Sequence, residues 1–220
     1  MVFGDEIDID IGRRCAAAAA ALRAEALDGV SDIVPTFNTV ALHYQPRLPD
    51  AHDAAQRLED DITRILQAAN PDGGATPSSK EVDIPVCYGG AQGPDLAHVA
   101  AHCGLTEPDV IRLHSAMPAY VFMLGFAPGA PYIGVHDARL AIGRRDTPRT
   151  ALPAGSVAIA NRQTMIYPNV SPGGWHIIGA TPLVLFDPDQ DPPTLLSPGD
   201  TVRFRPIDTD EFAALRDARA

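Results

Sequence analysis

Glycine and proline punctuate residues 124–175 so densely that no long helix can form there. The stretch begins Leu124-Gly-Phe-Ala-Pro-Gly-Ala-Pro-Tyr-Ile-Gly134, passes through Leu152-Pro-Ala-Gly-Ser-Val157 and closes with Ser171-Pro-Gly-Gly-Trp175. Glycine permits positive φ and close backbone approach, whereas proline fixes φ and removes a hydrogen-bond donor. The pieces between these residues are short and strand-like. The stretch therefore indicates β-strands joined by loops that each hold one shape, as loops around a binding pocket do.

The chain from residue 120 onward continues this alternation of short apolar segments and turn residues. A short helix is predicted at 210–219, after six strands at 120–124, 156–160, 164–167, 175–179, 183–186 and 201–205. Many short strands at this spacing predict a closed barrel or a sandwich.

The first 72 residues follow a different pattern, in which helices flank strands. The predicted elements are a helix, two strands and a helix, at 8–28, 30–37, 39–44 and about 50–69. Asp5 or Asp8 is expected to cap the first helix, Gly29 to occupy its C′ position, and Asn70-Pro71 to end the second helix. This order predicts a small α+β sandwich.

Such a sandwich would need a strand before its first helix, and Val2-Phe3 could form only the end of one. We expect either that the natural chain begins upstream or that the first sheet lacks a full edge strand. Residues 70–80 are rich in Gly, Pro and Ser and predict a linker. The linker would separate a domain at 1–72 from a second domain at 81–220, whose first strand is predicted at 81–88.

Residues 94–116 predict a helix, a glycine turn and a second helix that Thr106 caps. A DNA-binding helix-turn-helix has this outline, but its second helix would carry Glu107 and Asp109 against Arg112 alone. The formal net charge of the whole chain is -11, which also opposes binding to nucleic acid or to anionic membranes. We therefore expect two short helices that cover one end of a barrel.

The composition is that of a soluble globular protein, with 45% hydrophobic and 20% charged residues. No apolar run approaches the roughly 20 residues that span a bilayer, and the first residues lack the pattern of a signal peptide. The cysteines, Cys15, Cys87 and Cys103, are far apart and odd in number, which favours reduced thiols. We therefore expect a cytoplasmic protein that does not contact membranes.

Several catalytic motifs are absent, among them the nucleophile elbow, the Walker phosphate loop and the dinucleotide fingerprint. His98 and His102 are four residues apart on a predicted helix, which could place two ligands on one metal ion. No glutamate follows His98 and further ligands would be needed, so an ordinary helix surface is the better interpretation and no metal site is predicted. Nothing around Cys87 or Cys103 indicates a thiol of low pKa.

Arginines offer a stronger lead, because guanidinium groups suit carboxylates and phosphates. Arg144, Arg145 and Arg149 stand close together in an acidic chain, and Arg162 follows. They are either surface charges paired with acidic residues or ligands for an anionic substrate.

Other side chains in the same half of the chain leave similar alternatives open. His114 and His136 are possible proton carriers, although a lone histidine is more often structural. Gln163, Tyr167 and Ser171 could donate hydrogen bonds to a carbonyl or lactam group. Three aromatic residues either wall a pocket or fill the barrel core, namely Phe126, Tyr132 and Trp175.

Four motifs in this half of the chain resemble those of the allophanate hydrolase subunit 1 family. They are Gly125-Phe-Ala-Pro-Gly-Ala-Pro-Tyr, Pro153-Ala-Gly-Ser-Val, Gln163-Thr-Met-Ile-Tyr-Pro and Ser171-Pro-Gly-Gly-Trp. The family includes the sporulation inhibitor KipI, the B subunit of bacterial 5-oxoprolinase and part of the carboxyltransferase region of urea carboxylase. The resemblance covers nearly the whole chain. It implies an α+β fold in which a small N-terminal α/β sandwich precedes a cyclophilin-like β-barrel.

The same resemblance implies a subunit that does not act alone. Its partner would be a homologue of allophanate hydrolase subunit 2 or of the 5-oxoprolinase C subunit, in a heterotetramer or larger assembly. The complex would hydrolyse a small anionic amide or lactam, most often 5-oxoproline to glutamate, or act as an allophanate hydrolase. ATP would be used by the full complex, with no cofactor bound by this chain. The alternative is a KipI-like protein that binds and inhibits a sensor histidine kinase.

The resemblance and the residue chemistry together give candidate site residues. The catalytic candidates are His114, Arg149 and Gln163. The substrate-binding candidates lie in the shared motifs, except for Arg145 between the first two of them, and are Phe126, Pro128, Gly129, Tyr132, Arg145, Ser156, Tyr167, Ser171, Gly173 and Trp175. Four positions depart from the family pattern: Ala130 replaces Phe, Asn161 and Met165 replace Gly, and Ala180 replaces Arg.

Overall fold

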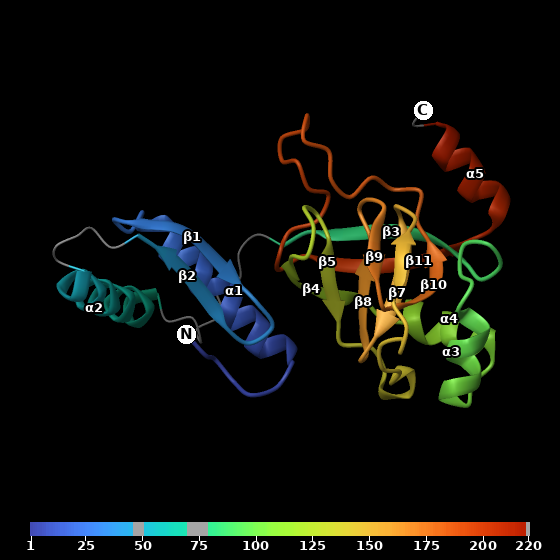
Figure 1. The fold of residues 1–220 in the computed structure, drawn as a ribbon, viewed down its shortest axis with the longest axis horizontal. Helices are drawn as coiled ribbons and strands as arrows, with labels where there is room; N and C mark the ends of the chain where they lie inside the picture. The colour runs from blue at the N-terminus through green and yellow to red at the C-terminus, as the bar shows by residue number, and fades with distance from the viewer. Residues whose placement is uncertain (46–50, 70–78, 219–220) are drawn as a thin grey trace. The chain divides into compact units, whose positions relative to one another are not determined.

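The computed structural model describes residues 1–45, 51–69 and 79–218, and Figure 1 shows the fold. The chain forms two compact units, Met1–Ser79 and Lys80–Ala220, which are described separately below. Most of the expected linker, and the Asn70-Pro71 helix stop, lie outside the described residues. In the described ranges, no helix is long and apolar enough to cross a membrane.

The first unit packs two helices with one antiparallel pair of strands. Its elements are α1 (Ile9–Ala24), β1 (Val30–Pro35), β2 (Val40–Tyr44) and α2 (Ala51–Ala69). Helix α1 turns a face of small residues inward, so Cys15, Ala18 and Ala19 allow close approach to Ile33 and Val40. The predicted order of elements in this unit is confirmed.

Local capping in the first unit agrees with the sequence at one end of α1 and departs from it at the other. The Asp8 carboxylate accepts hydrogen bonds from the N–H groups of Asp10 and Ile11, as expected of an N-cap. The helix ends at Ala24 with Glu25 as its C-cap, so the expected C′ role of Gly29 is wrong. Gly29 instead takes a φ of 77° just before β1, where a left-handed residue redirects the chain.

The segment before α1 pairs only briefly with β2. Val2 forms an isolated bridge with Thr39, and the N–H of Phe3 donates to the Asn38 carbonyl at 2.8 Å.

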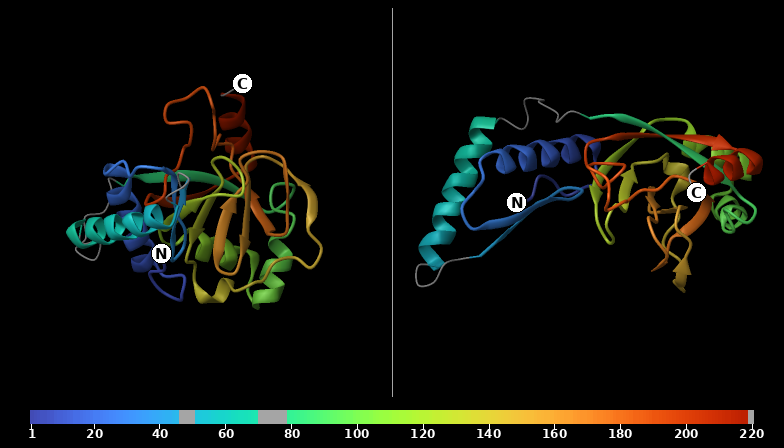
Figure 2. Two further views of the ribbon diagram at one scale, coloured as in Figure 1. Left: turned by 60° about the vertical axis from the view of Figure 1, so that its left-hand side comes forward. Right: turned by 90° about the horizontal axis from the view of Figure 1, so that it is seen from above.

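The second unit is built on a closed barrel of seven strands. Around the barrel the order is β10-β3-β11-β4-β5-β8-β7. The strands are β3 (Glu81–Tyr88), β4 (Ala119–Leu124), β5 (Pro131–Gly134), β7 (Ser156–Ala160), β8 (Gln163–Ile166), β10 (His176–Ala180) and β11 (Thr201–Ile207). Strands β3 and β11 are parallel and run side by side in both views of Figure 2, while the other neighbours are antiparallel.

Four helical segments and a small separate sheet accompany the barrel. The helices are α3 (Leu96–Cys103), α4 (Glu107–Ser115), the 3₁₀ turn η2 (Ala138–Leu140) and α5 (Thr209–Asp217). The separate sheet pairs β6 (Arg149–Leu152) with β9 (Ser171–Gly173). Thr106 caps α4 by accepting from the Asp109 N–H, as predicted, and Gly104 ends α3 with a φ of 66°.

Most strand predictions for the second unit are confirmed, and the prediction at 183–186 is wrong. That segment forms only an isolated bridge from Phe186 to Thr194. Its backbone pairs locally with residues 193–195, so it makes a long loop beside the barrel instead of a barrel strand. Strands β5, β6 and β9 were not expected, because proline and glycine in and around them hide the alternation of a strand.

Alternate residues of the barrel strands face two different apolar layers. In β7, Val157 and Ile159 belong to the barrel interior, whereas Ala158 and Ala160 belong to a second cluster with Tyr167 and Trp175. Successive strand residues point to opposite faces, so this second cluster lies on the outer face. Leu152 from β6 joins it, which places the β6–β9 sheet over that face. The α+β prediction, with a small N-terminal unit followed by a β-barrel, is confirmed.

Candidate functional site

The second unit gathers two of the candidate arginines on one buried carboxylate. Asp95 is 5% exposed and accepts from Arg145 Nη1 at 3.0 Å, and from Arg149 Nη1 and Nη2 at 2.7 and 2.9 Å. It also accepts from the Ile177 N–H at 2.8 Å. Asp95 stands at the N-cap of α3 but makes no cap hydrogen bond, because its oxygens are used by these partners.

The charges of this cluster are mutually stabilising. Burial raises the pKa of Asp95, but the Arg149 hydrogen bond, the Ile177 N–H and the charges of both arginines outweigh it and hold the pKa below its usual range. The hydrogen bond to Asp95 in turn raises the pKa of Arg149. Two guanidinium groups share one carboxylate, so the cluster keeps a net positive charge that suits an anionic ligand.

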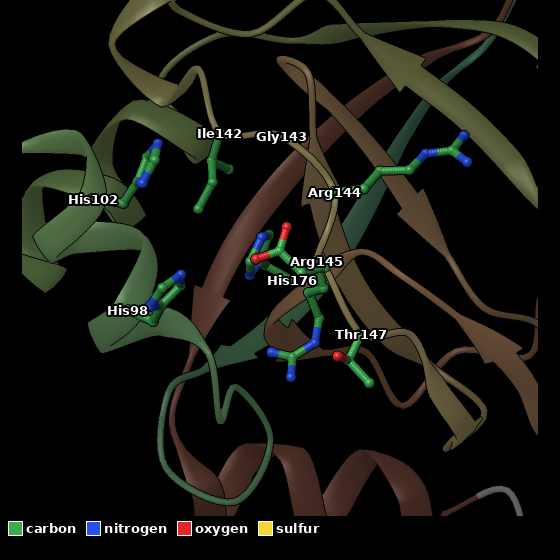
Figure 3. Close-up of a pocket in the computed structure, with 9 residues that line it drawn as sticks. His98, His102, Ile142, Gly143, Arg144, Arg145, Thr147 and His176 are labelled. Atoms are coloured by element: carbon green, nitrogen blue, oxygen red, sulfur yellow. The ribbon is translucent and has the colours of Figure 1, made fainter.

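A cavity of about 530 Å³ opens beside Arg145 (Figure 3). Figure 3 shows His98 and His102 on α3 across from Arg145 and Thr147, with His176 between them. The rings of His98 and His176 are stacked, with centroids 5.2 Å apart. Arg144 and Asp146 also line the cavity, but the Arg144 side chain points away from the three histidines (Figure 3). The positive charge that favours an anion here is that of Arg145, with Arg149 beside it on Asp95.

His176 in this cavity is held as a neutral ring. Burial lowers its pKa, and His98 and Arg145 act in the same direction. Asp95 and a hydrogen bond to the Gly143 backbone oppose the shift without cancelling it.

The candidate aromatic residues meet on the outer face of the barrel. Tyr132 and Trp175 make an edge contact with centroids 6.0 Å apart, and Phe126 contacts Tyr167 in the same way at 6.3 Å. The Arg144 guanidinium lies over the Trp175 ring, 6.0 Å from its centroid.

These aromatic side chains differ in exposure, and their phenol groups remain protonated. Trp175 and Tyr167 are buried, whereas Phe126 is 60% exposed. Burial raises the pKa of Tyr132 and of Tyr167, and the nearby charge of Arg144 only opposes that rise. The outer face therefore offers apolar surface and hydrogen-bond donors.

A second cavity of about 400 Å³ has Arg149 and Ser156 in its wall, with Gln92 and with Phe212 and Arg216 of α5. The Ser156 hydroxyl is occupied, since it donates to the Pro153 carbonyl at 2.7 Å. Arg145 and Arg149 thus hold the same carboxylate while lining two different cavities.

His114 lies inside the barrel, away from both cavities. It is fully buried, with Nδ1 2.7 Å from the Tyr88 hydroxyl and Nε2 2.8 Å from Thr164 Oγ1. His136 Nε2 reaches the same Thr164 hydroxyl at 2.6 Å. Burial lowers the pKa of His114 well below its usual range and that of His136 to about 4. The geometry favours a structural role for this network over the proton transfer considered for its histidines.

The remaining candidates are spread along the loops and strands. Gln163 is buried at the start of β8, and Ser171 donates to the nearby Asn169 carbonyl at 3.3 Å. Pro128 is exposed. Gly129, with a φ of 74°, packs so closely on residues 185–186 that a side chain would not fit. Gly173 likewise leaves room for the Tyr167 hydroxyl.

The four departures from the family pattern are accommodated in different ways. Asn161 and Arg162 take φ values of 51° and 64° in the turn between β7 and β8, a conformation that asparagine tolerates well. Met165 fills the outer-face cluster, and Ala130 is fully buried. Ala180 lines the second cavity.

Metal and thiol chemistry gain no support from the structure. Within the described residues, no group of three or more His, Cys, Asp or Glu side chains could hold a metal ion, and His98 and His102 stand with ring centroids 6.4 Å apart. Burial raises the pKa of each cysteine thiol, most strongly Cys15, to about 11.

Sequence reasoning missed Asp95 and His176, which complete the site. Asp95 has the pattern of an ordinary helix cap, and His176 that of one residue in a barrel strand. The arginines that bind Asp95 lie 50 and 54 residues further along the chain. The one signal for Asp95 in the sequence was indirect. Several arginines lie close together near 144–149, and such a group needs a carboxylate partner.

Fold and site together define a class, namely α+β proteins with a seven-stranded barrel and an arginine- and histidine-lined cavity on it. Residues 1–196 match the model of the carboxyltransferase domain, subdomain C and D. The chain therefore belongs to this family, and the resemblance inferred from its motifs is confirmed.

Known relatives extend over most of the chain. The B subunit of 5-oxoprolinase from Escherichia coli O157:H7 is 45% identical over 182 residues, which cover 82% of this chain and 79% of that protein. The B subunit of 5-oxoprolinase from Bacillus subtilis (strain 168) is 37% identical over 224 residues, covering 98% and 91%. The crystal structure of TTHA0988 superposes with a TM-score of 0.79 at 35% identity. That match covers 94% of this chain but 39% of TTHA0988.

Proposed function

We propose that this chain is a subunit of a 5-oxoprolinase complex, which opens the lactam of 5-oxoproline to give glutamate at the expense of ATP. The observation that carries the proposal is the similarity to two 5-oxoprolinase B subunits, at 45% and 37% identity over 82% and 98% of this chain. Identity at this level, with the shared family, supports a shared role in the same kind of assembly.

The site supports a binding role that a partner protein completes. The 530 Å³ cavity beside Arg145 has ample room for a small anionic lactam, and its charged lining suits a carboxylate. In the described part of the chain, the cysteine thiols have raised pKa values and the most buried histidines are bound in a closed network. These features favour a chain that holds substrate and does not hydrolyse it alone.

The proposal includes a partner and a location. The partner would be a homologue of the 5-oxoprolinase C subunit, with a related barrel fold, in a cytoplasmic heteromer. No Walker-type phosphate loop occurs in the sequence, so ATP would be used elsewhere in the complex.

The test is ATP-dependent conversion of 5-oxoproline to glutamate by the co-expressed subunits, with this chain present and omitted. We expect turnover only when the chain is present. As a control, a known B subunit added to the same partner proteins shows that they are competent. If that control is active and this chain gives no turnover, the substrate is another amide, or the chain binds a sensor kinase instead.

A further inference from the structure

Two polar atoms beside the 530 Å³ cavity are buried and have no partner. They are His176 Nδ1 and Arg145 Nε. Both side chains line the cavity, and His176 is 4% exposed. Buried polar groups in folded proteins are nearly always hydrogen-bonded, because leaving one unpaired is costly. Two such atoms at one cavity therefore indicate a missing ligand.

The chemistry of each unpaired atom is defined. Arg145 Nη1 donates to Asp95, and Nε carries an N–H that has no acceptor. His176 is hydrogen-bonded to the Gly143 backbone, and Nδ1 is the nitrogen without a partner, so this bond uses Nε2. In the neutral ring Nε2 then carries the proton, and Nδ1 is an acceptor.

A ligand that satisfies both atoms must offer an acceptor to Arg145 and a donor to His176. An amide whose C=O and N–H point to the same side does this with one group. Open-chain secondary amides are trans and point these atoms in opposite directions, whereas a small ring forces the cis arrangement. A primary amide also has one N–H on the side of its C=O, but its second N–H would need a further acceptor. A five-membered lactam therefore presents the required pair in fixed geometry.

The charges around the cavity indicate which further group the ligand carries. Arg145 and Arg149 share the single carboxylate of Asp95, which leaves one net positive charge in this cluster. Among the described residues, Asp146 is the only acidic side chain in the cavity lining. A carboxylate attached to the lactam ring would be attracted by the two guanidinium groups of the cluster.

We propose that Arg145 Nε donates to the lactam carbonyl and His176 Nδ1 accepts from the lactam N–H of a ring that carries a carboxylate. This inference rests on the proposed function and assigns substrate recognition in that complex to this chain. Both residues bind and orient the lactam, and no bond is made or broken by them. The stacked His98 ring holds His176 in place.

The test compares 5-oxoproline with its lactone analogue, 5-oxotetrahydrofuran-2-carboxylate, in the assembled complex. The lactone keeps the carbonyl and the carboxylate but replaces the N–H with a ring oxygen. We expect the lactone, measured as an inhibitor of turnover, to bind at least about tenfold more weakly than 5-oxoproline. His176→Phe should remove this discrimination, and His176→Asn, which restores an acceptor, should recover part of it.

Arg145 is tested by Arg145→Lys, with Arg139→Lys as the matched control, since Arg139 binds the exposed Asp137 away from the cavity. We expect Arg145→Lys to raise KM about tenfold with little change in kcat, and the control to leave both unchanged. Unchanged discrimination in His176→Phe, or unchanged KM in Arg145→Lys, overturns the inference while the proposed function stands. Loss of turnover from the wild-type complex would instead overturn the proposed function and the inference with it.

Discussion

Asp95→Asn isolates what the shared carboxylate contributes to the barrel. The substitution keeps the shape of the side chain but removes its charge and directs an amide NH₂ toward groups that are themselves donors. Asp95 accepts four hydrogen bonds of 2.7–3.0 Å, two at each oxygen, and the two made to the oxygen that becomes NH₂ would be lost. The charges of Arg145 and Arg149 would then remain in a partly buried site with no counter-ion.

The size of the effect follows from the exposure of the partners. Removing one member of a buried ion pair costs about 3–5 kcal/mol. The Arg145 and Arg149 side chains are 29% and 28% exposed, so water screens part of the loss. We expect the free energy of unfolding to fall by about 2–3 kcal/mol, which lowers the unfolding temperature by roughly 6–9 °C.

The assay is urea and thermal unfolding followed by the fluorescence of Trp175, the chain's single tryptophan, which lies in the second unit. The pKa of Asp95 is lowered in the folded state, so its stabilisation is present above its unfolded pKa of about 3.9. That stabilisation is lost as the pH falls through the lower folded value. The difference between wild type and Asp95→Asn should therefore narrow below about pH 4.

The matched control is Asp137→Asn, because Asp137 pairs with Arg139 in an exposed position. We expect it to leave the unfolding midpoint unchanged. A loss below about 0.5 kcal/mol in Asp95→Asn at pH 7 would refute the view that this carboxylate organises the two arginines.

Three further predictions concern the packed layers on either side of the barrel wall. The added methyl group in Gly173→Ala would overlap the Tyr167 hydroxyl, so we expect the free energy of unfolding in urea to fall by about 1–3 kcal/mol and the Trp175 emission to shift. An unchanged urea midpoint would contradict this expectation. Thr164→Val removes the hydroxyl between the two interior histidines, and leaving Nε2 of each ring unpaired should lower the free energy of unfolding by roughly 2–4 kcal/mol. Burial lowers the pKa of His136 to about 4, so the folded state favours the neutral ring. The free energy of unfolding of the wild type should therefore fall as the pH drops from about 6.5 through 4. Urea midpoints that stay constant over this range would contradict the closed network.

Local signals in the sequence predicted most of the helices and strands but did not locate the cavity beside Arg145. Periodicity located α1, α2 and six of the seven barrel strands, and the caps at Asp8 and Thr106 were predicted from residue type. Strands β5, β6 and β9 were missed because they are short and interrupted by proline or glycine. Stable pairing of such segments depends on neighbours that are distant in the chain.

For the candidate site residues too, the sequence predicted some features and left others to the structure. Phe126, Tyr132 and Trp175 were expected to wall a pocket or fill the core, and they meet Tyr167 on the outer face of the barrel. The sequence could not distinguish a substrate arginine from a paired one, and the structure shows Arg149 bound to Asp95 through both terminal nitrogens.

By itself, the sequence determined the α+β class, most of the elements in their order and the family, because periodicity, caps and motif spacing are local properties of a chain. The tertiary structure decided which strands close the barrel, with β3 beside β11 although Glu81 and Thr201 are 120 residues apart. It also decided that Arg145, which binds Asp95, lines one cavity together with His176. Burial and distance set the charge state and free hydrogen-bonding atoms of those groups, and neither exists until the chain has folded.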